Sequence, residues 1–203
     1  MAAPAWLAAL EPLAPDVVAV WQAIDDEGPT IRGIAFRREI RRRAGPGSAA
    51  TLLAQQDAIA DALGAVLTEM PERLLRAPGG EGDWNVAQAF AHTTGARRWL
   101  AHAAALAARG EWPADAPMVV PGVPGPADAT LDTLLILLAK SRRSLATSAE
   151  AIAGHEAEPC PLDHPLVGHL RCGEWLLFVG VHDLMHLRQL HRLRASAGAA
   201  LGG

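Results

Sequence analysis

Several features are missing from this sequence, and each absence excludes a class of protein. The 203-residue chain has only two cysteines, Cys160 and Cys172, which are too few for a disulfide scaffold. No run approaches the roughly 20 consecutive apolar residues that a membrane span needs. Residues 1–16 lack the basic and continuously apolar regions of a secretory signal. We therefore expect a soluble, cytoplasmic protein with reduced thiols and no membrane partner.

An excess of positive charge is also missing. The formal net charge is −4, whereas nucleic-acid-binding proteins of this size usually present a basic surface. The exception is local, because five arginines crowd the segment from Arg37 to Arg43. We interpret this run as a solvated helix face that pairs with Asp25, Asp26 and Glu27. We expect no nucleic-acid partner.

Helical periodicity is what the sequence does contain. Between residues 51 and 76 apolar side chains recur every three, four or seven positions, which is typical of one face of an amphipathic helix. Asn85, followed three residues later by Gln88, is typical of a capping box at the start of a second helix. Glycine and proline clusters separate the periodic segments. The expected long helices span residues 51–76, 86–109, 130–154 and 172–195.

No segment shows the alternation of a β-strand, so we predict an all-α fold. The proline-rich segment 111–126 is long enough to cross the length of a bundle, which makes the second and third helices parallel. The result is an up-down-down-up four-helix bundle over residues 49–197. Residues 1–48 form a short N-terminal helical extension, with small helices expected over residues 15–24 and 31–43.

The pattern with chemical meaning is the pair His182 and His186, four residues apart on the last expected helix. At about 100° per residue the two side chains lie about 40° apart, and Gln189 falls on the same stripe. Trp175 and Phe178 share this stripe, so it should face the core, where an unpaired polar group costs roughly 1–3 kcal/mol. One metal ion satisfies two imidazoles at this spacing, and a pair of hydrogen-bonded core histidines is the alternative.

His92, on the second expected helix, is the best candidate for a third ligand. Gly95 and Ala96 lie on its face, and their small side chains leave room for an ion. With a rise of about 1.5 Å per residue, His92 and His186 reach the same level if the second and fourth helices are antiparallel. His191 falls on the opposite face of the last helix and should face solvent.

A second set of residues competes for the metal. Cys160, His164, His169 and Cys172 are of the types that bind structural zinc, but their spacing matches no established zinc pattern. We keep this cluster as the alternative site.

A longer series of residues carries a family resemblance. In chain order it consists of residues 83–92, which include Trp84 and His92, then His164, Pro165, Gly168, Glu174, Trp175, Leu176, His182, His186 and Gln189. This order resembles the DinB-like superfamily over about residues 51–195. The resemblance implies an up-down-down-up bundle, often a homodimer, in which His92, His182 and His186 hold one divalent transition metal, with zinc or nickel favoured.

The same resemblance implies two kinds of activity on small molecules. Relatives are transferases that use a low-molecular-weight thiol such as mycothiol, bacillithiol or glutathione, or they are metal-dependent hydrolases. We favour a thiol S-transferase acting on small electrophiles, because Asp183 and Glu174 lie off the ligand stripe and leave hydrolysis without a carboxylate base. Gln189 is expected to hydrogen-bond a ligand histidine. A metal-binding stress or interaction protein without turnover is the other alternative.

The position of the pocket mouth follows from the expected topology. Trp84 and the turn at residues 78–83 should lie at the end of the bundle nearest to the proposed ion. We therefore expect the pocket to open beside Trp84.

Overall fold

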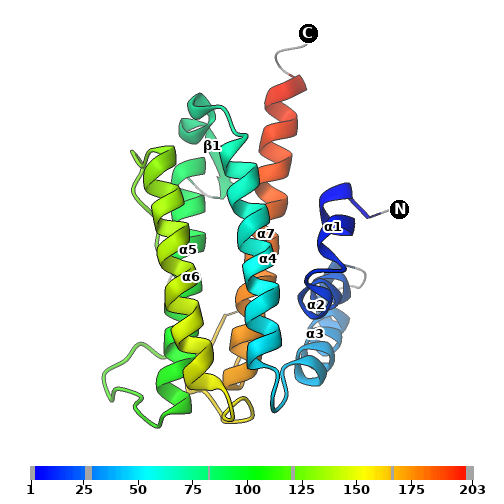
Figure 1. Ribbon diagram of the computed structural model, residues 1–203, viewed down its shortest axis with the longest axis vertical. Helices are drawn as coiled ribbons and strands as arrows, with labels where there is room; N and C mark the ends of the chain where they lie inside the picture. The colour runs from blue at the N-terminus through cyan, green and yellow to red at the C-terminus, as the bar shows by residue number, and fades with distance from the viewer. Residues whose placement is uncertain (1–2, 26–28, 82, 120–121, 166, 200–203) are drawn as a thin grey trace.

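The protein is mostly helical, as the prediction of an all-α fold requires. The computed structural model describes residues 3–25, 29–81, 83–119, 122–165 and 167–199 (Figure 1). None of the described helices combines the length and the apolarity needed to cross a membrane. The helices are α1 (Ala5–Leu10), α2 (Pro15–Asp25), α3 (Pro29–Arg43), α4 (Ala49–Thr68), the short 3-10 helix η1 (Glu72–Arg76), α5 (Val86–Ala108), α6 (Leu131–Ile152) and α7 (Cys172–Ala199).

Four long helices lie side by side and make up most of the molecule (Figure 1). Helix α5 packs against α6 and α7, and α4 packs against the same two helices from the other side. In the view of Figure 1, α4 and α7 run upward while α5 and α6 run downward. Helices α5 and α7 are therefore antiparallel, which is the arrangement that lets histidines on the two helices meet.

Local sequence signals explain most of the helix boundaries. The side chain of Asn85 accepts a hydrogen bond from the Gln88 amide, and the Gln88 side chain accepts one from Asn85, so the predicted capping box starts α5. Thr130 caps α6 in the same position. The first predicted helix was too long, because α4 stops at Thr68 and η1 follows. Pro71 explains the break, since the residue before a proline is disfavoured in a helix.

A small antiparallel sheet precedes α5, and the prediction of no strand was wrong here. Strand β1 (Pro78–Glu81) pairs with β2 (Trp84–Asn85). A two-residue strand is too short to show an alternating pattern, so no sequence signal marks it. The hairpin lies beside both α5 and α7.

The N-terminal helices pack against α7 and share one continuous core with the long helices. The side-chain oxygen of Gln55 on α4 accepts hydrogen bonds from the backbone N–H groups of Asp16 and Val17. These bonds supply partners for two N–H groups at the start of α2, which have none within the helix. Gly180 allows the close approach of α7, because a Cβ atom there would lie 2.8 Å from both Val17 and Gln56. Helix α7 is consequently buried on every side over most of its length.

Aromatic contacts hold the N-terminal helices in place and correct one expectation. Trp6 of α1 stacks on His191 with ring centroids 5.4 Å apart, so His191 is half-buried rather than turned to solvent. The Arg188 guanidinium lies 4.5 Å from the ring centroid of Trp21 on α2. The sequence pattern of α7 marked this face as the outer one, but the extension covers it.

The arginine run on α3 has partners from several elements. Arg41 pairs with the buried carboxylate of Glu174 on α7, and Arg43 pairs with Asp16 on α2. Of the partners predicted for this run, residues 26 and 27 lie outside the described residues, and so does the side chain of Asp25. The contacts that are described attach α3 to α2 and α7.

Candidate metal centre

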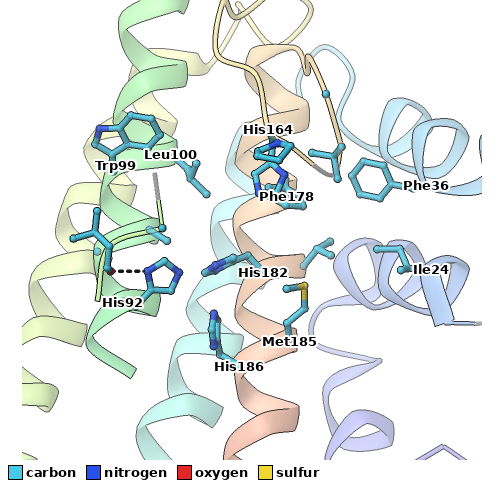
Figure 2. Close-up of a pocket in the computed structure, with 18 of the residues that line it drawn as sticks. Ile24, Phe36, His92, Trp99, Leu100, His164, Phe178, His182, Met185 and His186 are labelled. Carbon is cyan, nitrogen blue, oxygen red and sulfur yellow. Dashed lines mark hydrogen bonds between the residues drawn. The ribbon is translucent and has the colours of Figure 1, made fainter. Parts of the chain in front are cut away.

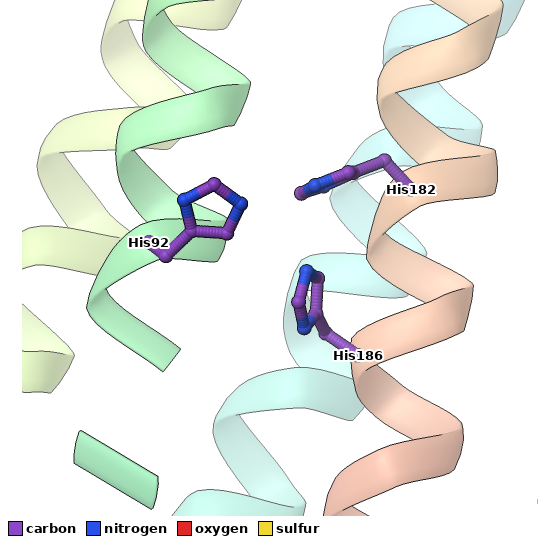
Figure 3. Close-up of side chains that lie close together, drawn as sticks. All are labelled: His92, His182 and His186. Carbon is purple, nitrogen blue, oxygen red and sulfur yellow. The ribbon is translucent and has the colours of Figure 1, made fainter. Parts of the chain in front are cut away.

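Three histidines from two helices come together near the middle of α7. His92 comes from α5, while His182 and His186 come from successive turns of α7 (Figure 3). One potential ligand atom from each side chain lies within 4.8 Å of the other two. The ring centroids are 4.6 Å apart for His182 and His186, and 5.4 and 5.5 Å from these two to His92. The structure thus assembles the three side chains that the sequence singled out.

The ring of His92 is oriented by the segment that links α5 to α6. Its Nδ1 lies 2.8 Å from the carbonyl oxygen of Val123. Because a carbonyl oxygen can only accept, Nδ1 carries the proton and donates the hydrogen bond. This tautomer leaves Nε2 with a free lone pair. Gly125 allows the link to run this close to α5, because a Cβ atom there would lie 2.1 Å from the Ala91 Cβ. The Gly125 amide also donates to the Gln88 carbonyl oxygen at 3.3 Å.

The ring of His186 is oriented by Gln189, one turn further along α7. The Oε1 atom of Gln189 lies 2.9 Å from Nδ1 of His186, which places the donated proton on Nδ1 and leaves Nε2 as the acceptor. The amide nitrogen of Gln189 in turn donates to the Gly79 carbonyl oxygen on β1. The hydrogen bond that the sequence assigned to Gln189 is therefore present, and it ties the site to the hairpin.

The ring of His182 is buried, as is that of His186, which is 5% exposed. His182 is 9% exposed, and its Nδ1 has no hydrogen-bond partner among the described residues. Burial lowers the pKa of His182 well below its ordinary value, and the neighbouring His186 and His92 lower it further. The ring is neutral at pH 7, which is the form that binds a metal ion.

The three side chains fit a divalent transition metal. His92 and His186 each donate a hydrogen bond from Nδ1 to an oxygen of the protein. His182 is buried, and its Nδ1 has no hydrogen-bond partner among the described residues. Ligand histidines in metalloproteins commonly donate their second N–H to a carbonyl or amide oxygen in this way. Imidazole nitrogens suit zinc and nickel, among other first-row metals.

A large cavity opens in front of the histidines. Its volume is about 1060 Å³, and it lies between α5 and α7 with α3 closing the far side (Figure 2). The expected opening beside Trp84 was wrong, because neither Trp84 nor any described residue of 78–83 lines the cavity. The Trp84 ring instead packs against His92 with a centroid separation of 5.0 Å and covers that end. The described lining comes from α2, α3, α5, α7 and the loops around residues 122–125 and 164–168.

The family of the chain follows from a family-model comparison. The model of the DinB superfamily matches residues 57–190, about two thirds of the chain. The chain belongs to the DinB superfamily. No curated protein and no solved structure matches it.

The range that the DinB-superfamily model matches covers the three clustered histidines but not the N-terminal helices. Helices α5, α6 and most of α7 lie inside it, and all three clustered histidines do as well. Helices α1, α2 and α3 lie outside it. The part of the cavity wall that α3 provides therefore lies outside the range that the family model matches.

The competing cysteine and histidine cluster does not assemble. The His164 ring packs edge-on against Phe178 with centroids 5.1 Å apart, whereas the His169 side chain is exposed. Burial raises the pKa of Cys160 to about 11 and that of Cys172 to about 12, so both thiols stay protonated at neutral pH. Among the described residues these four do not form a group that could hold an ion.

A buried ion pair beside the site could not be foreseen from the sequence. Arg97 of α5 pairs with Asp183 of α7, and both side chains are fully buried. Burial raises the pKa of Asp183 to about 6, and Arg97 opposes this shift. Breaking a buried pair by removing one partner typically costs about 3–5 kcal/mol, so the pair fixes α5 against α7 where His92 meets His182. The only sequence signal was a charge on each of two otherwise apolar helix faces.

Proposed function

We propose that this chain is a metal-dependent thiol S-transferase that acts on small electrophilic molecules. His92, His182 and His186 would hold one divalent ion, with zinc or nickel as the favoured metals. The helices α4 to α7 would form the up-down-down-up bundle that the family resemblance implies. The observation that carries the proposal is the convergence of three imidazoles on the wall of a large cavity.

The chain's own residues would prepare the site for this chemistry. When bound, an ion held by three neutral imidazoles lowers the pKa of a coordinated thiol or water toward 7. Val123 and Gln189 hold the protons of His92 and His186 on Nδ1, so that Nε2 is the nitrogen with the lone pair in each ring. Apolar side chains of the cavity, such as Phe178 and Leu100, keep bulk water away from the reacting groups.

The absence of a carboxylate favours thiol transfer over hydrolysis. No aspartate or glutamate among the described residues lines the cavity. Metal-assisted hydrolysis commonly uses such a base to deprotonate water, whereas a thiol ionises far more readily on its own. Asp183 and Glu174 are engaged in ion pairs with Arg97 and Arg41 instead.

Metal-dependent hydrolysis is the second candidate, and His164 is the observation that favours it. This side chain lines the same cavity as the three clustered histidines (Figure 2). Burial lowers its pKa, so the ring is neutral at pH 7 and could accept a proton from water. A His164→Phe variant keeps the aromatic contact with Phe178 and removes the base.

Metal analysis followed by a thiol screen tests the proposal. Protein purified without an affinity tag should contain one equivalent of zinc or nickel, and electrophilic substrates should be consumed only when mycothiol, bacillithiol or glutathione is present. Turnover that needs no thiol and is lost in His164→Phe would establish hydrolysis. Stoichiometric metal without turnover under any of these conditions would identify a non-catalytic metal-binding protein.

A further inference from the structure

The wall of the cavity opposite the bundle is built by the N-terminal extension. Ile24 of α2 and the α3 residues Gly33, Phe36 and Arg37 line it, facing the side where His92 and Trp99 lie (Figure 2). All four of these lining residues precede the range that the family model matches. Part of the cavity wall thus comes from residues outside the matched range.

This wall is fixed to the bundle at several points. The Phe36 ring meets the Phe178 ring of α7 edge-on, with centroids 6.0 Å apart. The Arg37 guanidinium donates to the carbonyl oxygens of Val167 at 2.7 Å and His169 at 3.2 Å. These contacts join α3 both to α7 and to the loop that carries His164. The shape of the cavity is therefore fixed by these contacts.

The lining of the cavity selects an apolar occupant. Among the described residues, its ionisable groups are the three clustered histidines, His164 and Arg37, and the Arg37 guanidinium already donates to two carbonyl oxygens. The rest of the lining is mainly apolar. Its larger apolar side chains are Ile24, Phe36, Trp99, Leu100, Val167, Phe178, Val181 and Met185. Ligand pockets typically enclose about 300–1,000 Å³, so a cavity of about 1060 Å³ holds far more than a small reactive group.

We propose that the extension makes this site selective for electrophiles with a long alkyl or aryl tail. The reactive end lies at the three histidines, and the tail runs toward Ile24 and Phe36. This inference rests on the proposed function for the reactive end, but the tail site depends only on the cavity wall.

Two metal-chelating probes of different length test the tail site. Acetohydroxamate and octanohydroxamate share a head group and differ only in alkyl length, so their ratio of Kd values for the zinc-loaded, full-length protein reports on the tail. We expect octanohydroxamate to bind at least about 100-fold more tightly, because each buried methylene adds to the affinity. Isothermal titration calorimetry measures both values.

Gly33→Leu should narrow the cavity at the extension wall, where there is room for a Cβ atom. A Cβ atom at Gly33 meets no atom within 4 Å, and Gly45, which does not line the cavity, is equally open. Gly33→Leu should reduce the advantage of octanohydroxamate about tenfold or more and leave the Kd of acetohydroxamate within about twofold. The matched variant Gly45→Leu should change neither. An unchanged advantage in Gly33→Leu would overturn the inference.

A metal-free measurement separates this inference from the proposed function. The uncharged dye N-phenyl-1-naphthylamine should fluoresce on binding to metal-free protein, and Gly33→Leu should weaken this binding while Gly45→Leu does not. If the protein binds no zinc but the dye still distinguishes the two variants, the proposed function fails and the tail site stands. If the dye binds none of the three proteins, or binds all three equally, the tail site is refuted even where zinc binds.

Discussion

Two groups of metal-binding residue types lie in this chain, and only one of them assembles. His92, His182 and His186 project from two antiparallel helices, and their potential ligand atoms lie within 4.8 Å of one another. The group that contains Cys160 and His169 lies in and beside the loop before α7, where the cysteine is buried and the histidine is exposed. Residue type alone does not distinguish the two groups.

The difference lies in what orients each side chain. In the assembled group, a carbonyl oxygen holds the ring of His92 and an amide oxygen holds the ring of His186. The helices themselves are fixed by the buried pair of Arg97 and Asp183. A metal site therefore needs outer contacts that keep its ligands in place, and substitutions of ligands, outer contacts and loop cysteines should have effects that decrease in that order.

The largest effect is expected from removing a ligand. His182→Ala or His186→Ala leaves two imidazoles, so stoichiometric zinc or nickel should be lost from the purified protein. Circular dichroism should retain the helical spectrum, because each substitution changes one side chain of a helix that is packed on every side. Elemental analysis checks the metal, and a variant of either residue that keeps one equivalent would place the ion elsewhere.

A smaller effect is expected from Gln189→Ala. This change removes the acceptor for Nδ1 of His186 and should weaken metal binding about 10–100-fold, which is typical for an outer contact of a ligand histidine. Gln189→Glu keeps the acceptor for His186 but sets an oxygen against the Gly79 carbonyl oxygen, so it should restore only part of the affinity. Competition with a chromogenic chelator measures both variants. Equal affinity of Gln189→Ala and the unchanged protein would show that His186 needs no such support.

A still smaller and less direct effect is expected from Gly125→Ala. The added methyl group would meet Ala91, so the linking segment must move away from α5 and take the Val123 carbonyl oxygen with it. Overpacking of this kind costs about 1–3 kcal/mol in the free energy of unfolding. Gly122→Ala is the matched control, because a Cβ atom there meets nothing within 4 Å. Urea unfolding should separate the two variants, and identical midpoints would contradict the tight contact.

The loop cysteines should have no effect on the metal. Cys160→Ser combined with Cys172→Ser should leave the metal content unchanged. In the unchanged protein both thiols should resist iodoacetamide at pH 8, because pKa values of about 11 and 12 leave almost no reactive thiolate. Mass spectrometry of the alkylated protein checks this. Loss of zinc in the double variant would revive the cysteine site.

The sequence predicted those features that depend on a single helix. The capping box at Asn85 and the shared stripe of His182, His186 and Gln189 follow from spacing along one chain segment. The meeting of His92 with the pair required only that α5 and α7 be antiparallel. These features are local, or nearly so, and periodicity reports them directly.

Features that depend on distant segments were missed. The burial of His191 requires Trp6, and the pairing of Arg97 requires Asp183 on another helix. The cavity wall formed by Phe36 depends on how α3 docks on α7. Such contacts leave no periodic pattern in either segment, so the sequence indicated the three clustered histidines but not the cavity in front of them.

The contact between Trp6 and His191 has a consequence for how the protein is made. The two residues lie near opposite ends of the chain, so the ribosome releases α1, α2 and α3 long before it synthesises the helix on which they dock. Their apolar faces must stay exposed during most of translation, when chains of this kind are prone to aggregate. Closing the cavity is therefore one of the last steps of folding. The first 48 residues are the part of the chain that waits longest for its partner and is longest accessible to chaperones.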